Sequence, residues 1–249
     1  LFGPASKLTA RALVNRVWGR LLGRGIVEPV DDMRFSNPPV NERLLDALAD
    51  DVIEHDWDFK HLVRTVLNSR TYQLSSRVTA ANVHDRMNFS HAYLRRLSAE
   101  QLLDAIVQVT GVDEPFRVAP PGSRAVTLPY SEVHSRFLRM FGRPSERMSA
   151  CECIRETGTT LPQIMHFVCG ETVIEKVAAK DGTLAGIVER QPKDDRLVET
   201  LYLTVLNRYP TTSEQQFSQQ YLRESEDRAT GAQDLMWALL TSQEFLFNH

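Results

Sequence analysis

The spacing of apolar residues constrains this chain more than any other feature of its sequence. Apolar residues recur three and four positions apart in segment after segment, as in Leu8–Leu22, where Val14 and Trp18 share one helical face. Alternation with a period of two, which is typical of strands, is limited to Ala125–Leu128. The sequence therefore predicts an all-α fold: an irregular bundle of about ten to twelve helices with well over half of the residues helical and little or no sheet.

Capping signals place the ends of several helices. Asp58 is an expected N-cap for Phe59–Ser69, and Ser98-Ala-Glu-Gln101 is a capping box that opens a helix to about Val109, with Gly111 as its stop. Further helices are expected over Val40–His55, Ser131–Phe141, Leu161–Val168, Glu171–Ala179, Asp195–Asn207, 212–224 after a capping box at Thr212, and Gln233–Phe245.

A proline-rich segment interrupts this pattern. Pro115, Pro120, Pro121 and Pro129 fall within residues 112–130, where helices are disfavoured. We therefore expect an N-terminal helical lobe over 1–111, a connector over 112–130 and a C-terminal lobe over 131–249, either as two packed lobes or as one integrated domain.

Composition excludes several classes of protein. A net charge of −3 and a pI near 6.2 argue against a nucleic-acid binder, whose binding domain is usually basic. No apolar stretch approaches the roughly 20 residues that a membrane span requires. Three cysteines are too few for a disulfide scaffold. Because the chain starts at Leu1 and runs straight into helical sequence, we expect it to be a fragment of a longer protein.

The first group of candidate site residues contains all the cysteines. Cys151 and Cys153 form a Cys-x-Cys pair, and His166 and Cys169 are three apart on an expected helix. Three thiolates and one imidazole suit tetrahedral zinc. Because the return path from the pair to the helix that carries His166 is short, we expect both sulfurs within roughly 10 Å of His166. A disulfide between Cys151 and Cys153 and two free thiols are the alternatives. Because no CxxCH motif occurs, this chain does not itself attach a c-type haem.

The second group of candidates is basic. Arginine clusters bind carboxylate, sulfate or phosphate, so an anionic polysaccharide is a conceivable ligand. The alternative is a solvated face or local pairs with neighbouring glutamates. The cluster consists of Arg136, Arg139, Arg143, Arg147 and Arg155, and the first three recur at helical spacing.

The third group lies near the N-terminus and is expected to be structural. We predict that Arg11 or Arg16 hydrogen-bonds the acidic loop that runs from Glu28 to Asn37, and that Trp18 is largely buried. Adjacent carboxylates in a loop rarely point into one site. The neighbouring Asp31 and Asp32 therefore favour ion pairing over acid–base catalysis. The loop residues concerned are Asp31, Asp32 and Asn37.

Several stretches together resemble one family, a C-terminal domain of secreted planctomycete proteins known as the PSD-one domain, or domain of unknown function fifteen fifty-three. They include LVNRVWGRLLGRGIVEPVDDMRFSNPP, WDFKHLVRTVLNSRTYQLS, RRLSAEQLLDAI, FLRMFGRPSERMSACECIRE, TLPQIMHFVCGE, LYLTVLNRYPT and WALLTSQEFLFNH. The resemblance implies a secreted or periplasmic location and a multidomain parent with upstream domains, among them a cytochrome c-like domain. Ile154 and Cys169 stand where the family usually has Glu and Asn.

The sequence leaves two hypotheses for the function of this chain. No GxSxG, P-loop, GxGxxG or HExxH motif occurs. The first hypothesis is therefore a non-catalytic helical module that docks partner domains of the same secreted polypeptide or a ligand. The second is a redox- or metal-associated enzyme domain that uses the Cys151/Cys153 pair and the arginine cluster, with an anionic polysaccharide as a candidate substrate.

Overall fold

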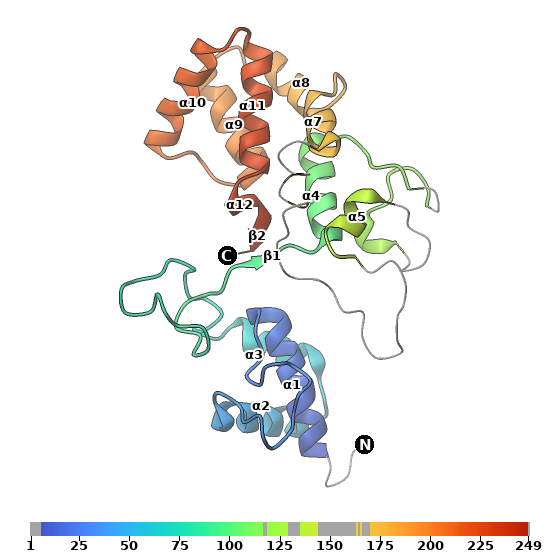
Figure 1. The fold of residues 1–249 in the computed structure, drawn as a ribbon, viewed down its shortest axis with the longest axis vertical. Coiled ribbons are helices and arrows are strands. Elements are labelled where there is room, and N and C mark those ends of the chain that lie inside the picture. The colour runs from blue at the N-terminus through green and yellow to red at the C-terminus, as the bar shows by residue number, and fades with distance from the viewer. Residues whose placement is uncertain are drawn as a thin grey trace. The chain divides into compact units, whose positions relative to one another are not determined.

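The structure, a computed structural model, describes residues 6–116, 119–128, 135–143, 163, 165 and 170–248. It is 57% helical, and in the part that it describes its only sheet pairs two short strands, so the predicted all-α class is confirmed. Contacts divide the chain into unit 1 (1–95 with residue 249) and unit 2 (96–248), and Figure 1 shows the elements of both. This division falls at Arg95, whereas the sequence analysis placed the connector at 112–130.

Unit 1 is built on three helices. α1 (Ser6–Leu22) packs against α2 (Glu42–Glu54) and α3 (Phe59–Leu67). Their apolar faces form one core that contains Val14, Trp18, Leu45, Leu62 and Val66. Trp18 is only 3% exposed, as the sequence predicts.

The caps of these helices follow the sequence signals. Asn41 accepts a hydrogen bond from the N–H of Leu44 at the start of α2. Asp58 accepts from the N–H groups of Lys60 and His61 at the start of α3, as predicted. These N–H groups, His61 first, hold the pKa of the Asp58 carboxyl below its usual range.

The long segment after α3 folds back onto this core without forming a helix. Phe89 meets Trp18 edge to face, with ring centroids 5.4 Å apart, and its N–H donates to the hydroxyl of Tyr93. Asp85 accepts from the N–H groups of Met87, Asn88 and Ser90. Side-chain packing and turn hydrogen bonds therefore fix a segment that apolar periodicity does not describe.

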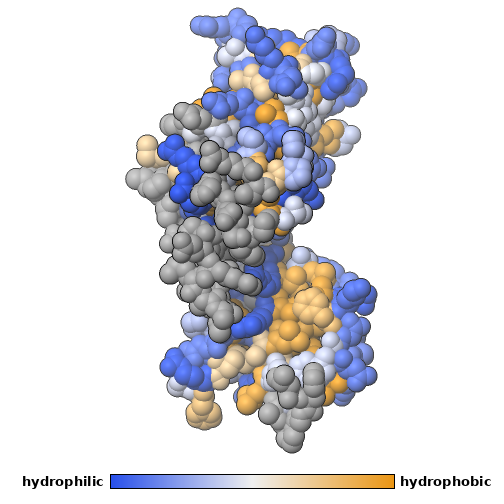
Figure 2. Space-filling model, turned by 90° about the vertical axis from the view of Figure 1, so that its right-hand side faces the viewer, coloured by the Kyte–Doolittle hydropathy of each residue, from blue (hydrophilic) through white to orange (hydrophobic). Residues whose placement is uncertain are grey.

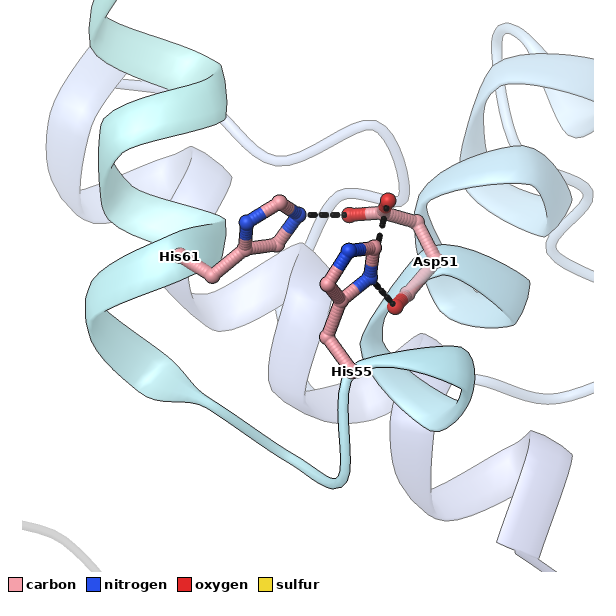
Figure 3. Close-up of side chains that lie close together, drawn as sticks. All are labelled: Asp51, His55 and His61. Carbon is pink, nitrogen blue, oxygen red and sulfur yellow. Dashed lines mark hydrogen bonds and ion pairs between the residues drawn. The ribbon is translucent and has the colours of Figure 1, made fainter.

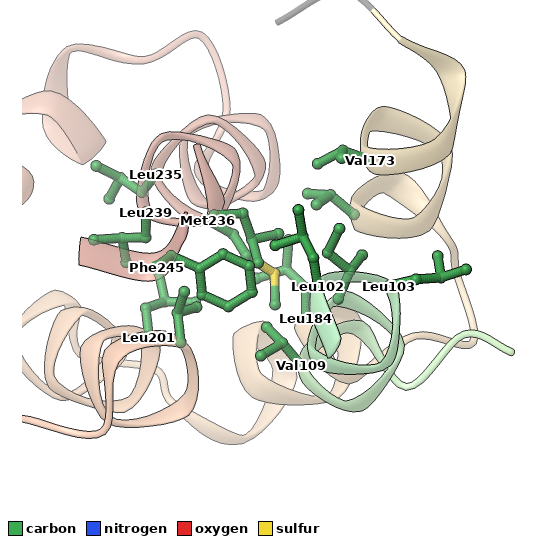
Figure 4. Close-up of a cluster of buried hydrophobic side chains, with 14 of the residues drawn as sticks. Leu102, Leu103, Val109, Val173, Leu184, Leu201, Leu235, Met236, Leu239 and Phe245 are labelled. Atoms are coloured by element: carbon green, nitrogen blue, oxygen red, sulfur yellow. The ribbon is translucent and has the colours of Figure 1, made fainter. Parts of the chain in front are cut away.

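Unit 2 surrounds a second, larger core (Figure 4). Leu102 and Leu103 lie on the helix that begins at Ala99, and Met236 lies on the helix that begins at Arg228. All three side chains are fully buried in this core. The elements are α4 (Ala99–Thr110), η1 (Ala125–Thr127), α5 (Arg136–Met140), α7 (Glu171–Ala178), α8 (Thr183–Arg190), α9 (Asp194–Leu206), α10 (Thr212–Glu224), α11 (Arg228–Leu240) and α12 (Gln243–Leu246). The small sheet pairs β1 (Arg95–Arg96) with β2 (Phe247–Asn248).

An arginine ties three C-terminal helices together. Arg208, just after α9, donates hydrogen bonds of 2.6–2.9 Å to Glu214 of α10 and Glu244 of α12. Its guanidinium also lies over the Tyr202 ring, 5.4 Å from the centroid. The hydrogen bonds from Arg208 are the largest cause that lowers the pKa of Glu214, to about 2, so this carboxylate stays ionised.

Several helix predictions are correct and others need correction. The capping box at Ser98 and the left-handed stop at Gly111 (φ 68°) are confirmed. The second box is formed by Thr211 with Glu214, one residue earlier than predicted. The predicted bounds of the last helix, Gln233–Phe245, are wrong, because α11 begins after its N-cap Asp227 and ends at Leu240, and the separate helix α12 follows.

The remaining differences concern short elements. Ala125–Leu128 contains the 3-10 helix η1 rather than a strand, because Asp104 accepts hydrogen bonds from the N–H groups of Ala125 and Val126. α8 was not predicted at all. α5 begins at Arg136, after its N-cap Ser135. None of the described helices is long and apolar enough to cross a membrane.

Candidate functional site

The cysteine group predicted from the sequence lies outside the described residues. This applies to Cys151, Cys153, His166 and Cys169. The zinc, disulfide and free-thiol hypotheses all stay predictions.

The arginine cluster is only partly within the described chain, and its described members do not share a face. Arg136 and Arg139 are exposed on α5, whereas Arg143 is only 6% exposed. Gly142 adopts a positive φ of 88° directly after the helix, and Arg143 follows with its side chain turned inward. Arg147 and Arg155 lie outside the described residues.

Buried partners occupy Arg143. Its Nε lies 3.7 Å from Oε1 of Glu100, a side chain that is also buried, and its guanidinium donates to the carbonyls of Ala125 and Leu128. Arg143 therefore joins α4 to η1 inside unit 2 and is not presented to an anionic ligand. The prediction that Arg143 shares a helical face with Arg136 and Arg139 is therefore wrong.

The N-terminal group is brought together as a structural unit. Arg16 Nε lies 2.5 Å from Asp31 Oδ1, which is the predicted contact between α1 and the acidic loop. Arg11 instead pairs with two carboxylates of α2, those of Glu42 and Asp46.

A buried asparagine of α1 holds the other side of this loop. Asn15, which is 0% exposed, donates to the carbonyls of Val27 and Val30 and accepts from the N–H of Val27. The sequence shows the asparagine but gives no sign that its amide points inward. The base of the loop is therefore fixed to α1 by an ion pair and three further hydrogen bonds.

The outer part of the loop presents an aromatic side chain to solvent. Asp32 receives two 2.6 Å hydrogen bonds from Arg34, which lower the pKa of the Asp32 carboxyl. The backbone N–H of Asn37 donates to the carbonyl of Arg34, and its side-chain amide donates to the backbone carbonyl of Asp32. Phe35, at the turn between them, is 105% exposed. A tightly hydrogen-bonded turn thus carries an uncovered phenylalanine.

A second constellation in unit 1 joins one carboxylate and two imidazoles (Figure 3). His61 Nε2 lies 2.9 Å from Asp51 Oδ2, and His55 Nδ1 lies 3.3 Å from Asp51 Oδ1. The two imidazole rings stack with centroids 3.8 Å apart. One ligand atom from each residue lies within 4.8 Å of the others, the only such group of three among the described His, Cys, Asp and Glu residues.

The connection between α2 and α3 positions these three side chains. Asp51 and His55 are four residues apart at the end of α2, so they share a face. Asp56 and Trp57 both adopt positive φ, at 50° and 63°, and this tight reversal brings the start of α3 back beside the end of α2. His61 therefore faces the other two.

Sequence reasoning missed this cluster because it looked for two histidines on one helix. The available signal was a carboxylate and a histidine at i and i+4, a cap at Asp58, and a second histidine in the first turn of the next helix.

One pocket in unit 2 is lined by three acidic residues, two of which are engaged by the protein itself. It has a volume of about 260 Å³, and its lining includes Asp104, Glu114 and Arg124. Asp104 caps η1 and lies near Arg124, and Glu114 pairs with Lys176 at 3.1 Å. The pocket is also smaller than typical ligand sites of roughly 300–1,000 Å³.

Comparison with known proteins identifies the family. The model of PSD1, described as a protein of unknown function (DUF1553), matches residues 1–222, and the chain therefore belongs to this family. No curated protein and no solved structure matches the chain. The family resemblance in the sequence is confirmed, and the name of the family assigns no activity.

Proposed function

We propose that this chain is a non-catalytic docking module, and that Phe35 is the centre of its docking surface. The single observation that carries this proposal is an aromatic side chain that is 105% exposed on a loop held by hydrogen bonds at both ends. Leaving a large apolar side chain in water sacrifices about 1.5–3 kcal/mol relative to burying it. A partner that covers Phe35 recovers this free energy.

Preorganisation makes the loop suited to this role. Binding is weakened when a loop must be ordered on association, and a fixed loop avoids that cost. Aromatic anchors on such surfaces are the residues that dominate binding at protein interfaces. Figure 2 shows that hydrophobic side chains also gather on one face of unit 1, the lower part of that view.

The charges around Phe35 define the chemistry of the partner. Arg34 is paired with Asp32, and Arg16 is paired with Asp31, so the rim of the turn is neutralised within the loop. The surface that receives Phe35 is therefore an apolar pocket rather than a charged groove. We place that pocket on one of the domains that the family resemblance implies upstream in the same secreted polypeptide.

A titration tests the proposal. The upstream domains of the natural polypeptide are produced separately and titrated calorimetrically into this chain and into its Phe35→Ala variant. Loss of a buried phenylalanine at about 2 kcal/mol predicts affinity weakened by about 30-fold. Phe217→Ala on α10, where the phenylalanine is 69% exposed without a comparable loop, is the control and is expected to leave the affinity unchanged.

Three results would count against docking through Phe35. Either the upstream domains do not bind this chain, or Phe35→Ala and Phe217→Ala bind equally well. A strong dependence of affinity on salt would show that charges rather than the apolar turn dominate, because paired surface charges contribute little at moderate ionic strength.

A further inference from the structure

We propose that Asp51, His55 and His61 form a binding site for Zn²⁺ or a chemically similar divalent transition-metal ion. This site lies in unit 1, uses none of the cysteines, and is independent of docking through Phe35.

The structure brings one ligand atom from each of the three residues to within 4.8 Å of the others. Zinc bonds of about 2.0–2.1 Å to imidazole nitrogen and carboxylate oxygen place neighbouring ligand atoms about 3.3 Å apart. The observed separations are 3.3 Å from His55 Nδ1 to Asp51 Oδ1 and 2.9 Å from His61 Nε2 to Asp51 Oδ2. His55 Nδ1 also lies 2.9 Å from the backbone carbonyl oxygen of Asp51, a contact that metal binding replaces. Because a metal ion lies in the plane of each imidazole that binds it, the two stacked rings, with centroids 3.8 Å apart and 13° from parallel, turn about their side-chain torsions when both bind one ion.

The donor set selects the class of metal. Two imidazole nitrogens and one carboxylate suit zinc and its neighbours in the first transition row, whereas Ca²⁺ and Mg²⁺ prefer sites made of oxygen. Three protein ligands leave a fourth position for water. The site has room for that water, because the side chains of Asp51 and His61 are each 29% exposed and that of His55 is 46% exposed.

The surroundings favour a cation. The cluster lies at the carboxyl-terminal end of α2, where the helix dipole is negative. The side chain of Glu54 in the same turn adds negative charge and has no ion-pair partner among the described residues, whereas Asp50 is paired with Lys7.

The backbone holds the ligands in place before any metal arrives. The N–H of Trp57 donates to the carbonyl of Val52, and the N–H of Asp58 donates to that of His55. Asp58 in turn caps the helix that carries His61. The reversal between the two helices is therefore fixed by hydrogen bonds that do not involve the three ligand side chains.

The test measures metal binding to the full chain without an affinity tag. Cys151, Cys153 and Cys169 are replaced by serine, so that a site on the cysteines cannot contribute. After treatment with a chelator, the protein is titrated with Zn²⁺ by calorimetry, and Co²⁺ is added in parallel to record the absorption spectrum of its d–d transitions. We expect one equivalent of Zn²⁺ and an intense Co²⁺ spectrum typical of four-coordinate nitrogen and oxygen ligands.

Variants assign the binding to the three residues. Asp51→Asn keeps the shape of the side chain and removes its charge, and His61→Ala removes a ligand. Because the loss of a supporting residue already weakens metal binding by about 10–100-fold, the loss of a ligand is expected to weaken it by more than about 100-fold. His84→Ala removes an exposed histidine outside the cluster and is the control, expected to bind as the parent does.

The pH dependence supplies a second signature. Both imidazoles must be neutral to bind, so the affinity for Zn²⁺ is expected to fall as the solution is made more acidic. The proposal is overturned if the cysteine-free chain binds no Zn²⁺, or if His61→Ala and His84→Ala bind it equally. Circular dichroism of each variant verifies its fold, and if His61→Ala is unfolded, the isosteric Asp51→Asn decides the question.

Discussion

Replacing Asn15 by alanine is expected to destabilise unit 1 far more than the loss of one polar side chain usually does. The amide of Asn15 is 0% exposed and makes three hydrogen bonds, at 2.7–2.9 Å, to the backbone of Val27 and Val30. Alanine leaves the buried carbonyl and N–H of Val27 and the partly buried carbonyl of Val30 without these partners.

The magnitude follows from the number of groups left unpaired. Each buried group without a partner costs about 1–3 kcal/mol. Water that enters the space left by the amide recovers part of this cost. We therefore expect Asn15→Ala to lower the free energy of unfolding of unit 1 by about 3–5 kcal/mol. Asn37→Ala, which removes a more exposed amide from the same loop, is expected to cost about 1 kcal/mol.

The assay needs a signal from unit 1 alone. Trp18 and Trp57 lie in unit 1, and Trp237 is the one remaining tryptophan. Urea unfolding followed by tryptophan fluorescence in a Trp237→Phe background therefore reports on unit 1. The midpoint and slope of the transition give the free energy of unfolding for the parent, Asn15→Ala and Asn37→Ala.

Equal costs for the two asparagine variants would refute the reasoning, because they would show that the amide of Asn15 is no better satisfied than an exposed one. A loss below about 1 kcal/mol for Asn15→Ala would do the same. Such a result would also remove the argument that Phe35 is carried on a preformed loop.

Three further predictions concern unit 2. Arg143→Met removes the guanidinium beside the buried carboxylate of Glu100 and is expected to cost about 3–5 kcal/mol in urea unfolding, part of which Glu100→Gln in the same chain restores. The pKa of Glu214 is lowered from 4.5 to about 2. The ionised carboxylate therefore stabilises the fold fully above about pH 4.5, and this contribution is lost as the pH falls toward 2. The difference in the free energy of unfolding between the parent and Glu214→Gln should shrink over that range. Gly111→Ala places a methyl carbon 2.6 Å from a hydroxyl of α8 at a φ of 68°, and a loss of about 1–2 kcal/mol is expected in thermal unfolding.

The sequence predicts the helices well where local rules decide them. Asp58, Ser98 and Gly111 set helix ends through hydrogen bonds and backbone conformation within a few residues, and all three behave as predicted. α8 is short and has no side-chain cap, so it gives no comparable signal. The C-terminal helix was misplaced because its apolar periodicity runs past Leu240, where a turn separates α11 from α12.

Side-chain direction is what the sequence could not supply at the candidate sites. Helical spacing places Arg143 with exposed arginines, but its position after a left-handed glycine turns it to the interior. Asp51 and His55 share a face by spacing, yet the position of His61 depends on the reversal at Asp56 and Trp57, where two consecutive residues other than glycine adopt positive φ. Such contacts are decided by tertiary structure rather than by local pattern.

Cross-linking from position 35 tests the docking proposal most directly. A photoreactive phenylalanine analogue replaces Phe35 in the complete natural polypeptide, and mass spectrometry maps the peptides to which it becomes joined; the same analogue at Phe217 is the control. The account predicts cross-links from position 35 to apolar residues of one upstream domain, and none to that region from position 217. Absence of cross-links from position 35, or the same scattered pattern from both positions, would contradict it.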